Sequence, residues 1–95
     1  MEIKFSNYFS DEIDSIIQFI DSVNNIGAGF RWFLKFEDFL KKELQFPSTH
    51  PICKNQTFSK YNLSCLFFND WTIAFQYNES QVLLVAIVHK TNIVD

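Results

Sequence analysis

Basic side chains are scarce in this sequence of 95 residues. Eight lysines and arginines stand against eleven aspartates and glutamates, which leaves a formal net charge of −3. Nucleic-acid-binding proteins usually carry a positive surplus, because neutralising phosphates supplies much of their affinity. The composition therefore disfavours direct DNA binding by this chain. The basic residues Lys35, Lys41 and Lys42 fall in a predicted helix, where a solvated face explains them.

Signals for export or membrane insertion are also missing. Residues Met1–Phe5 have neither the basic start nor the long apolar core of a signal peptide. The longest apolar run, Val82–Val88, has the length of a strand, so no membrane span is expected. These absences predict one cytoplasmic domain. In that compartment the two cysteines, Cys53 and Cys65, are expected to be free thiols.

Motifs for catalysis and metal binding are absent as well. His50 and Cys53 are too few ligands for a metal site. Neither cysteine has a Cys-x-x-Cys partner, and no serine or cysteine lies in a nucleophile motif. His89 ends the last predicted strand and is interpreted as a polar strand end. We therefore expect no metal ion and no cofactor, and the chemistry of the residues does not indicate an enzyme.

Apolar and aromatic residues, in contrast, are abundant. Hydrophobic residues make up 47% of the chain and aromatic residues 18%, with twelve phenylalanines. A single domain of this size buries roughly 60–65% of its unfolded surface. This aromatic load is more than such a small core comfortably hides, which indicates an apolar surface for a partner.

The second half of the chain predicts an antiparallel meander of three strands, Tyr61–Phe68, Trp71–Tyr77 and Gln81–His89. The last strand is apolar at every position from Val82 to Val88, which is typical of a central strand with both faces covered. Asn69 and Asp70 tolerate positive φ, so a two-residue turn should join the first two strands.

This turn fixes which side chains share a face of the sheet. It pairs four sets of residues on a heavy face that should be packed: Phe68 with Trp71, Leu66 with Ile73, Ser64 with Phe75, and Asn62 with Tyr77. The lighter face should be open, and it carries Leu63, Cys65, Phe67, Thr72, Ala74 and Gln76.

The first half predicts a short strand over Ile3–Ser6 and a helical hairpin. Ser10 is the expected N-cap of the first helix, which carries an isoleucine stripe and ends near Asn24. The second helix should span Phe30–Gln45 after a turn at Gly27–Gly29. The stretch Ile52–Phe58 is either an edge strand or a loop, and Thr91–Asp95 has no predicted structure. The predicted fold class is a two-layer α+β domain, 1–95, with helices on one sheet face and the last strand central.

The second helix has an unusually wide apolar arc. One face carries Phe30, Phe33, Leu34, Leu40 and Leu44, and an adjoining face carries Trp32, Phe36 and Phe39. An apolar arc this wide must contact two different surfaces. Either the second face contacts another chain, or the hairpin buries it completely; the sequence leaves both open.

A resemblance follows from this layout of strand, helical hairpin and closing meander. The residues that carry it are Ile26-Gly27-Ala28, Phe33 to Phe46-Pro47, His50-Pro51, Trp71 to Phe75, and Ala86 to His89. The layout resembles the RelE/ParE superfamily of bacterial type II toxins. It implies a twisted antiparallel sheet backed by a helical hairpin. It also implies an antitoxin partner that wraps the toxin with a helix and often an added strand. The expected antitoxin-binding residues are Trp32, Phe36, Phe39, Leu63 and Phe67.

The ribonuclease branch of this superfamily cuts mRNA on the ribosome with basic residues on the open sheet face. At the corresponding positions this chain has Leu63, Cys65 and Thr72 instead of basic residues. Such a face cannot stabilise a phosphoryl transition state. The resemblance is therefore nearer the ParE branch, which is associated with inhibition of DNA gyrase, and the expected function is that of a toxin acting by protein binding.

Two alternatives stay open at this point. A ribosome-dependent endonuclease would have to use the remaining catalytic candidates, Lys60, Tyr61, His89 and Lys90. An inactive relative would serve as an interaction module. The reading frame beside the gene discriminates between a toxin–antitoxin pair and an isolated module.

Overall fold

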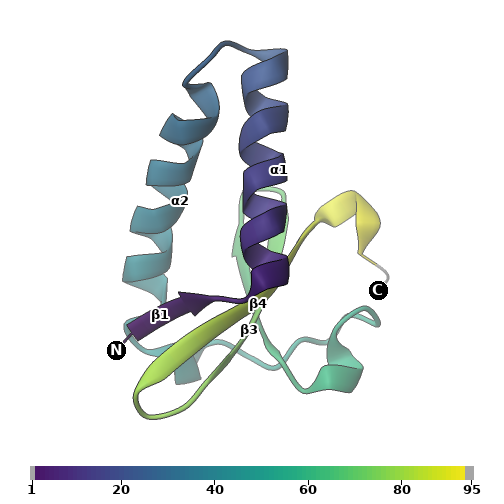
Figure 1. The fold of residues 1–95 in the computed structure, drawn as a ribbon. Coiled ribbons are helices and arrows are strands. Elements are labelled where there is room, and N and C mark those ends of the chain that lie inside the picture. Colours follow the sequence, from purple (N-terminus) through teal and green to yellow (C-terminus); the bar gives the residue numbers. More distant parts are fainter. Residues whose placement is uncertain (1, 94–95) are drawn as a thin grey trace.

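The computed structural model describes residues 2–93, which form two helices packed over a four-stranded sheet (Figure 1). The element order is β1 (Glu2–Phe5), α1 (Asn7–Val23), α2 (Ala28–Glu43), β2 (Ser64–Phe68), β3 (Trp71–Tyr77) and β4 (Gln81–His89). Short 3-10 helices occupy Pro47–Thr49, Ser59–Tyr61 and Lys90–Asn92. The predicted two-layer α+β fold is confirmed. Val94 and Asp95, part of the tail predicted without structure, lie outside the described residues.

The strand order in the sheet is β1-β4-β3-β2, so β4 is an inner strand, as its unbroken apolar run predicts. The strands β2, β3 and β4 form the expected antiparallel meander. Strand β1 lies parallel to β4, with Ile3 opposite Val82 and Phe5 opposite Leu84. The sheet is therefore mixed, whereas the family resemblance implied antiparallel strands throughout.

The β2–β3 hairpin turns at Asn69 and Asp70, and Asn69 has a φ of 52°. Three of the four predicted pairs form: Ser64 with Phe75, Leu66 with Ile73, and Phe68 with Trp71. The predicted pair of Asn62 with Tyr77 does not form. Asn62 has a φ of 57° and ends the 3-10 turn at Ser59–Tyr61, so β2 begins only at Ser64 instead of Tyr61.

A β-bulge in β4 sets the faces of this strand. Ala74 pairs with Ala86 and Phe75 pairs with Leu84, which leaves Val85 as an extra residue. The extra residue shifts the alternation, so that Val82, Leu84 and Ile87 all belong to the core beneath the helices. This shift is how one continuous apolar run supplies both faces of the sheet.

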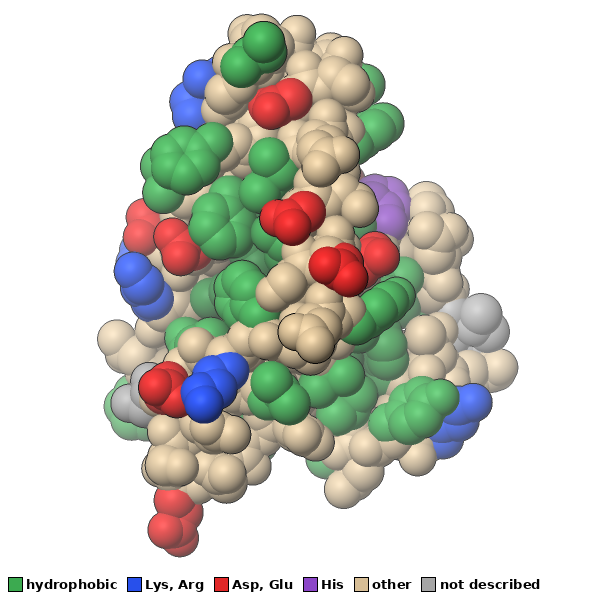
Figure 2. Space-filling view, in the orientation of Figure 1, with side chains coloured by type: hydrophobic (Ala, Val, Ile, Leu, Met, Phe, Trp, Pro, Cys, Tyr) green, Lys and Arg blue, Asp and Glu red, His purple; other side chains and the backbone are tan. Residues whose placement is uncertain are grey.

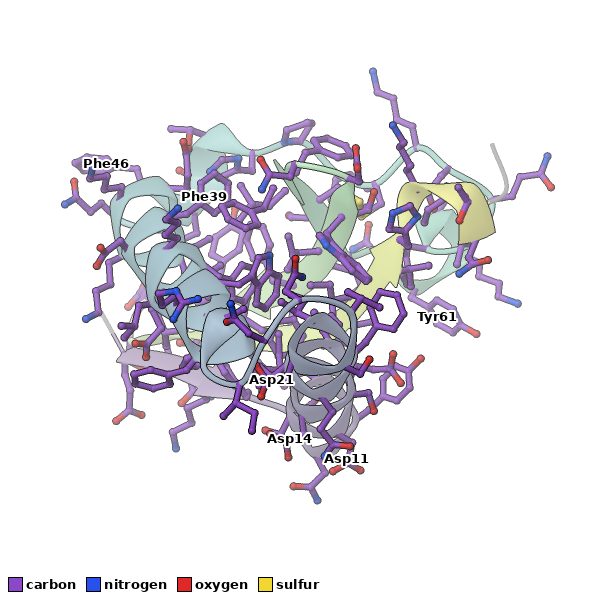
Figure 3. The ribbon with its side chains drawn as sticks, turned by 90° about the horizontal axis from the view of Figure 1, so that it is seen from above. Asp11, Asp14, Asp21, Phe39, Phe46 and Tyr61 are labelled. Carbon is purple, nitrogen blue, oxygen red and sulfur yellow. A yellow bond between two sulfur atoms is a disulfide. The ribbon has the colours of Figure 1, made fainter. Side chains whose placement is uncertain are left out.

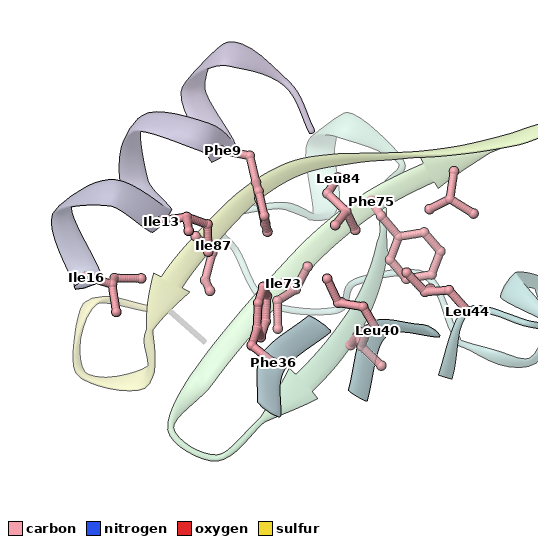
Figure 4. Packing of buried hydrophobic residues seen from close by; sticks show 12 residues of the cluster. Phe9, Ile13, Ile16, Phe36, Leu40, Leu44, Ile73, Phe75, Leu84 and Ile87 are labelled. Atoms are coloured by element: carbon pink, nitrogen blue, oxygen red, sulfur yellow. The ribbon is translucent and has the colours of Figure 1, made fainter. Parts of the chain in front are cut away.

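The main core lies between the helices and the heavy sheet face (Figure 4). Phe9, Ile13 and Ile16 come from α1 and Phe36 and Leu40 from α2. They meet side chains of β2, β3 and β4 that are almost inaccessible to solvent: Leu66, Ile73, Phe75, Val82, Leu84 and Ile87. The predicted packed face of the hairpin is therefore the face beneath the helices. Burial of this apolar surface is the main source of stability.

Helix α1 begins one turn earlier than its sequence predicts. Ser6, not Ser10, is the N-cap: its hydroxyl accepts the Phe9 N–H at 3.0 Å and donates to the Val85 carbonyl at 2.9 Å. One side chain therefore satisfies a free N–H at the helix start and fixes α1 to the bulge in β4. Ser10 lies inside the helix, where its N–H donates to the Ser6 carbonyl.

The turn between the helices uses its two glycines for different reasons. Gly27 has a φ of +97° and is the N-cap of α2, so α2 spans Ala28–Glu43, two residues ahead of the predicted range at both ends. Gly29 lies against the backbone of Ile17, where a Cβ would come within 2.4 Å of the carbonyl oxygen. Asp21 of α1 accepts the Gly29 N–H at 2.8 Å and so caps the second helix from the first.

Candidate protein-binding face

The sheet face opposite the helices, called the outer face below, is the candidate functional surface. Residues 51–63, called the covering segment below, cross part of this face and form a second, smaller core with it (Figure 1). The core consists of Cys53, Phe58 and Leu63 packed on Cys65, Ala74 and Ala86. The expectation of a fully open face is therefore wrong. Four of its six predicted residues are buried, and only Phe67 and Gln76 are exposed.

A disulfide between Cys53 and Cys65 fixes the covering segment to the sheet. The Cα atoms are 4.8 Å apart, and two backbone hydrogen bonds flank the pair, from the Cys53 N–H to Leu63 and from the Cys65 N–H to Pro51. The expectation of two free thiols is wrong. That expectation was based on the predicted compartment and took no account of how the covering segment folds back onto the sheet. Ile52 forms an isolated antiparallel bridge with Ser64, and the remainder of the ambiguous stretch up to Phe58 is loop.

One hollow on the outer face lies between Tyr8 and Tyr61 and has a volume of about 590 Å³. Its walls are almost entirely apolar, with Phe58 from the covering segment and Leu83 and Val85 from β4. Tyr8 and Tyr61 are 55% and 60% exposed, so their rings stand at its rim. Figure 3 shows Tyr61 on the far side of the molecule from Phe39 and Phe46. An apolar hollow with two aromatic rims fits a hydrophobic side chain of a partner.

A second hollow, of about 520 Å³, lies beside the edge strand β2. Phe67, which is 63% exposed, and Ile52, which is 48% exposed, supply much of its apolar surface. Lys54 and Lys90 also line it, and Lys90 forms an ion pair with Asp70 at 3.1 Å. The two hollows flank the disulfide-held segment.

The four catalytic candidates are divided between these places. Tyr61 lines the first hollow, and the Lys60 ammonium lies 5.2 Å from the centre of its ring. Lys90 lines the second hollow and is already paired with Asp70. His89 packs edge-on against Trp71 with ring centres 5.0 Å apart, and its Nδ1 accepts the Thr91 N–H. The four candidates therefore do not converge on one hollow.

His50 has a structural environment. Its Nε2 lies 2.9 Å from the Glu43 carbonyl at the C-terminal end of α2 and 3.6 Å from the Glu43 carboxylate. Its ring also packs edge-on against Phe75. The neighbouring Cys53 is in the disulfide, and residues 2–93 contain no cluster of three or more groups suited to a metal ion.

The predicted antitoxin-binding aromatics lie mainly inside the protein. Trp32 stacks on Phe36 at 5.2 Å, and both rings, together with Phe39, contact Phe68 of the β2–β3 hairpin. Phe36 is fully buried, and Trp32 and Phe39 are half-buried. The β2–β3 hairpin thus covers part of the wide arc of α2, and complete burial, the second of the two interpretations, holds only for Phe36. Leu63 is buried in the second core, and Phe67 alone of the five predicted residues is exposed.

The helical hairpin carries exposed apolar side chains that the sequence reasoning did not assign to a site. Phe19, Ile26 and Phe30 are 65%, 93% and 58% exposed, and Val23 and Leu34 are 59% and 44% exposed. Phe19 lies off the isoleucine stripe of α1, so a helical projection contained the signal. Phe30 and Leu34 extend the apolar arc of α2 beyond what the sheet can cover, and for this reason they are exposed although they continue the apolar face of the helix.

The charge on helix α1 is one-sided. Asp11, Glu12, Asp14 and Asp21 all lie in α1, which contains no lysine or arginine, whereas α2 carries residues of both signs. Figure 2 shows acidic side chains following α1, with apolar side chains in the groove between the helices. Positive charges on a partner would be steered to α1.

No described helix is long and apolar enough to cross a membrane. Comparison with family models found no match, and no curated protein matched in sequence. The fold does match solved structures. One is a chain from the chromosomal ParDE toxin–antitoxin system of P. aeruginosa, with a TM-score of 0.76 and 10% sequence identity; the alignment covers 100% of this chain and 97% of the other. The protein therefore has a RelE/ParE-like fold, as the sequence resemblance predicted.

Proposed function

We propose that this chain is the toxin of a type II toxin–antitoxin pair and acts in the cytoplasm by binding another protein. DNA gyrase is the target that the ParE branch suggests, and a cognate antitoxin would neutralise the chain. The shared fold with the ParDE chain supports the pair, since the two align over nearly their full lengths. The surface supports protein binding, because its main features are apolar hollows and exposed aromatic side chains, and the catalytic candidates do not meet at one point.

One observation carries the choice of protein binding over RNA cleavage. Leu63, Cys65 and Thr72 occupy the positions where the ribonuclease branch has basic residues, and they are only 6%, 3% and 5% exposed. Cys65 is also part of the disulfide. A phosphoryl transition state needs cations at the reacting group. Here these three positions are neutral and covered, so they cannot supply such cations.

The antitoxin would cover the apolar surface of the helical hairpin. Phe19 and Phe30 are large, more than half exposed and carried on rigid helices, which suits the groove binding of an amphipathic helix. The acidic residues of α1 would pair with basic residues of that helix. Phe67, at the edge strand β2, is the most exposed of the five residues that the sequence predicts to bind the antitoxin.

Controlled expression in bacteria tests this function. We expect induction of the chain alone to stop growth, and co-expression of the small neighbouring reading frame to restore it. The variant Phe30→Ser should keep its fold, because this side chain is 58% exposed, and should weaken antitoxin binding by about 10-fold or more if it is an anchor. Gln18→Ala, on the exposed surface of α1, is the matched control. Continued growth after confirmed expression of folded protein would reject the toxin assignment.

Transcript mapping separates the two modes of poisoning. We expect intact mRNA during growth arrest and the same arrest in a variant with His89→Ala and Lys90→Ala. Cleavage of transcripts within codons, lost in that variant, would establish the endonuclease instead. Inhibition of supercoiling by purified gyrase would support the target suggested by the ParE branch.

A further inference from the structure

We propose that the Cys53–Cys65 disulfide is a redox-sensitive clamp that holds the covering segment on the outer face. The covering segment is residues 51–63, and in the oxidised protein it forms walls of both hollows. Reduction would release it and remove those walls. The clamp would operate whatever molecule the chain binds, so it stands apart from the proposed toxin function.

The covering segment packs on the sheet through a small core. Its large buried side chains are Phe58 and Leu63, and they rest on the small residues Ala74 and Ala86. The bond from the Cys53 N–H to Leu63 closes the segment on itself, and the bond from the Cys65 N–H to Pro51 joins its start to β2 beside the disulfide. Asn55 binds the Phe58 N–H within the segment itself. A segment with so small a core has low local stability once its covalent link is gone.

Both hollows depend on where this segment lies. Phe58, Tyr61 and Leu63 line the hollow next to Tyr8. Ile52, Lys54 and Asn55 line the hollow next to Phe67. Cys53 and Cys65 stand near the two ends of the covering segment. One covalent bond therefore holds the residues that supply part of the lining of both hollows.

Reduction by a dithiol balances without any further reactant. A thiolate of the dithiol attacks one cysteine sulfur, which forms a mixed disulfide and releases the other cysteine as a thiolate. The second thiol of the dithiol then attacks the mixed disulfide and releases the first cysteine. The dithiol supplies two electrons and two protons and becomes a cyclic disulfide, while Cys53 and Cys65 become thiols. The cysteines are only 2% and 3% exposed, so attack must wait for local opening of the segment. We expect reduction to be slower than for an exposed disulfide.

The main core does not depend on this bond. Neither cysteine belongs to it, and the two tryptophans, Trp32 and Trp71, pack against it on the helix side of the sheet. Trp71 also lines the hollow next to Phe67, so its fluorescence responds to the covering segment. In a Trp71→Phe variant the remaining Trp32 reports the global fold separately, and release of the segment should leave this signal close to that of the oxidised protein.

Limited proteolysis with trypsin tests the clamp. Lys54 and Lys60 lie in the covering segment, and Lys35 and Lys41 in α2 serve as internal reference sites. After treatment with dithiothreitol and alkylation, cleavage at the two segment sites should rise by about 10-fold or more, with α2 still protected. The variant Cys53→Ser/Cys65→Ser should be cleaved equally fast with and without reductant, which controls for effects of the reagent.

Three results would overturn the clamp. Equal cleavage of oxidised and reduced protein would show that packing alone holds the segment. Simultaneous cleavage in α2 with loss of the tryptophan signal would show that the bond supports the entire fold. Alkylation of both cysteines in air-oxidised, folded protein would show that the bond does not form. The reductant experiment uses the natural sequence, so it decides the question even if the double variant fails to fold.

Discussion

Gly29 of α2 lies against the backbone of Ile17 in α1, so the substitution Gly29→Ala tests how closely the two helices pack. A Cβ at this position would lie 2.4 Å from the Ile17 carbonyl oxygen, 2.8 Å from its Cγ2 and 2.9 Å from its carbonyl carbon. Two of these three atoms are backbone, so a side-chain rotation cannot relieve the contact. The helices must move apart, which also stretches the 2.8 Å bond from the Gly29 N–H to Asp21.

The expected cost follows from three terms. Overpacking typically costs about 1–3 kcal/mol, and weakening the hydrogen bond costs about 1 kcal/mol. Alanine offsets roughly 0.5–1 kcal/mol, because it forms helix more readily than glycine. The net loss should be about 2 kcal/mol, which for a domain of this size lowers Tm by roughly 8–16 °C. Urea unfolding followed by tryptophan fluorescence measures this loss directly, since Trp32 and Trp71 both pack against the main core.

Gly27 provides the matched comparison. Its φ of +97° strains any residue with a Cβ, but an added Cβ would meet only the end of the flexible Arg31 side chain at 3.4 Å. Gly27→Ala should cost about 1–2 kcal/mol, and Gly27→Asn less, because asparagine tolerates the left-handed region. Asparagine should bring no such relief at Gly29, where space and not backbone conformation is limiting. A Gly29→Ala protein as stable as the natural one would refute the close helix crossing.

Five further substitutions, two of them controls, test other parts of the fold, each by the free energy of unfolding. Ser6→Ala should cost about 1 kcal/mol by removing the N-cap of α1, whereas Ser10→Ala should change stability by less than about 0.5 kcal/mol; the reverse order would place the helix start at Ser10. Phe75→Ala should cost about 3–5 kcal/mol because this ring is fully buried, while Phe46→Ala, at 68% exposure, should cost under about 0.5 kcal/mol. Asp21→Ala should cost about 1 kcal/mol by leaving the start of α2 uncapped, and an unchanged midpoint would show that water replaces the carboxylate.

Local patterns determined the elements and the inner position of β4. The apolar run from Val82 to Val88 predicted an inner strand, and the isoleucine stripe predicted the buried side of α1. Asn69 and Asp70 fixed the hairpin register, because a two-residue turn leaves one way to pair the strands. These features depend on residues close together in sequence, where periodicity and turn chemistry decide the outcome.

The candidate site was predicted less well, because its residues meet across long separations. The sequence placed a partner surface on the outer face but did not reveal that residues 51–63 fold back over part of it. It also did not reveal that Trp32, Phe36 and Phe39, the aromatic residues predicted to bind the antitoxin, all contact Phe68 of the β2–β3 hairpin. A local sequence pattern does not determine which apolar surfaces will pack against each other.

The sequence by itself thus determined the two-layer α+β class and the order of the elements. Only the tertiary structure decided the Cys53–Cys65 bond, the bulge at Val85 and the exposure of Phe19, Phe30 and Phe67. The physical reason is that secondary structure follows from interactions between near neighbours in the chain. Surface exposure and covalent pairing follow instead from how much apolar area each layer has left to cover after the elements pack.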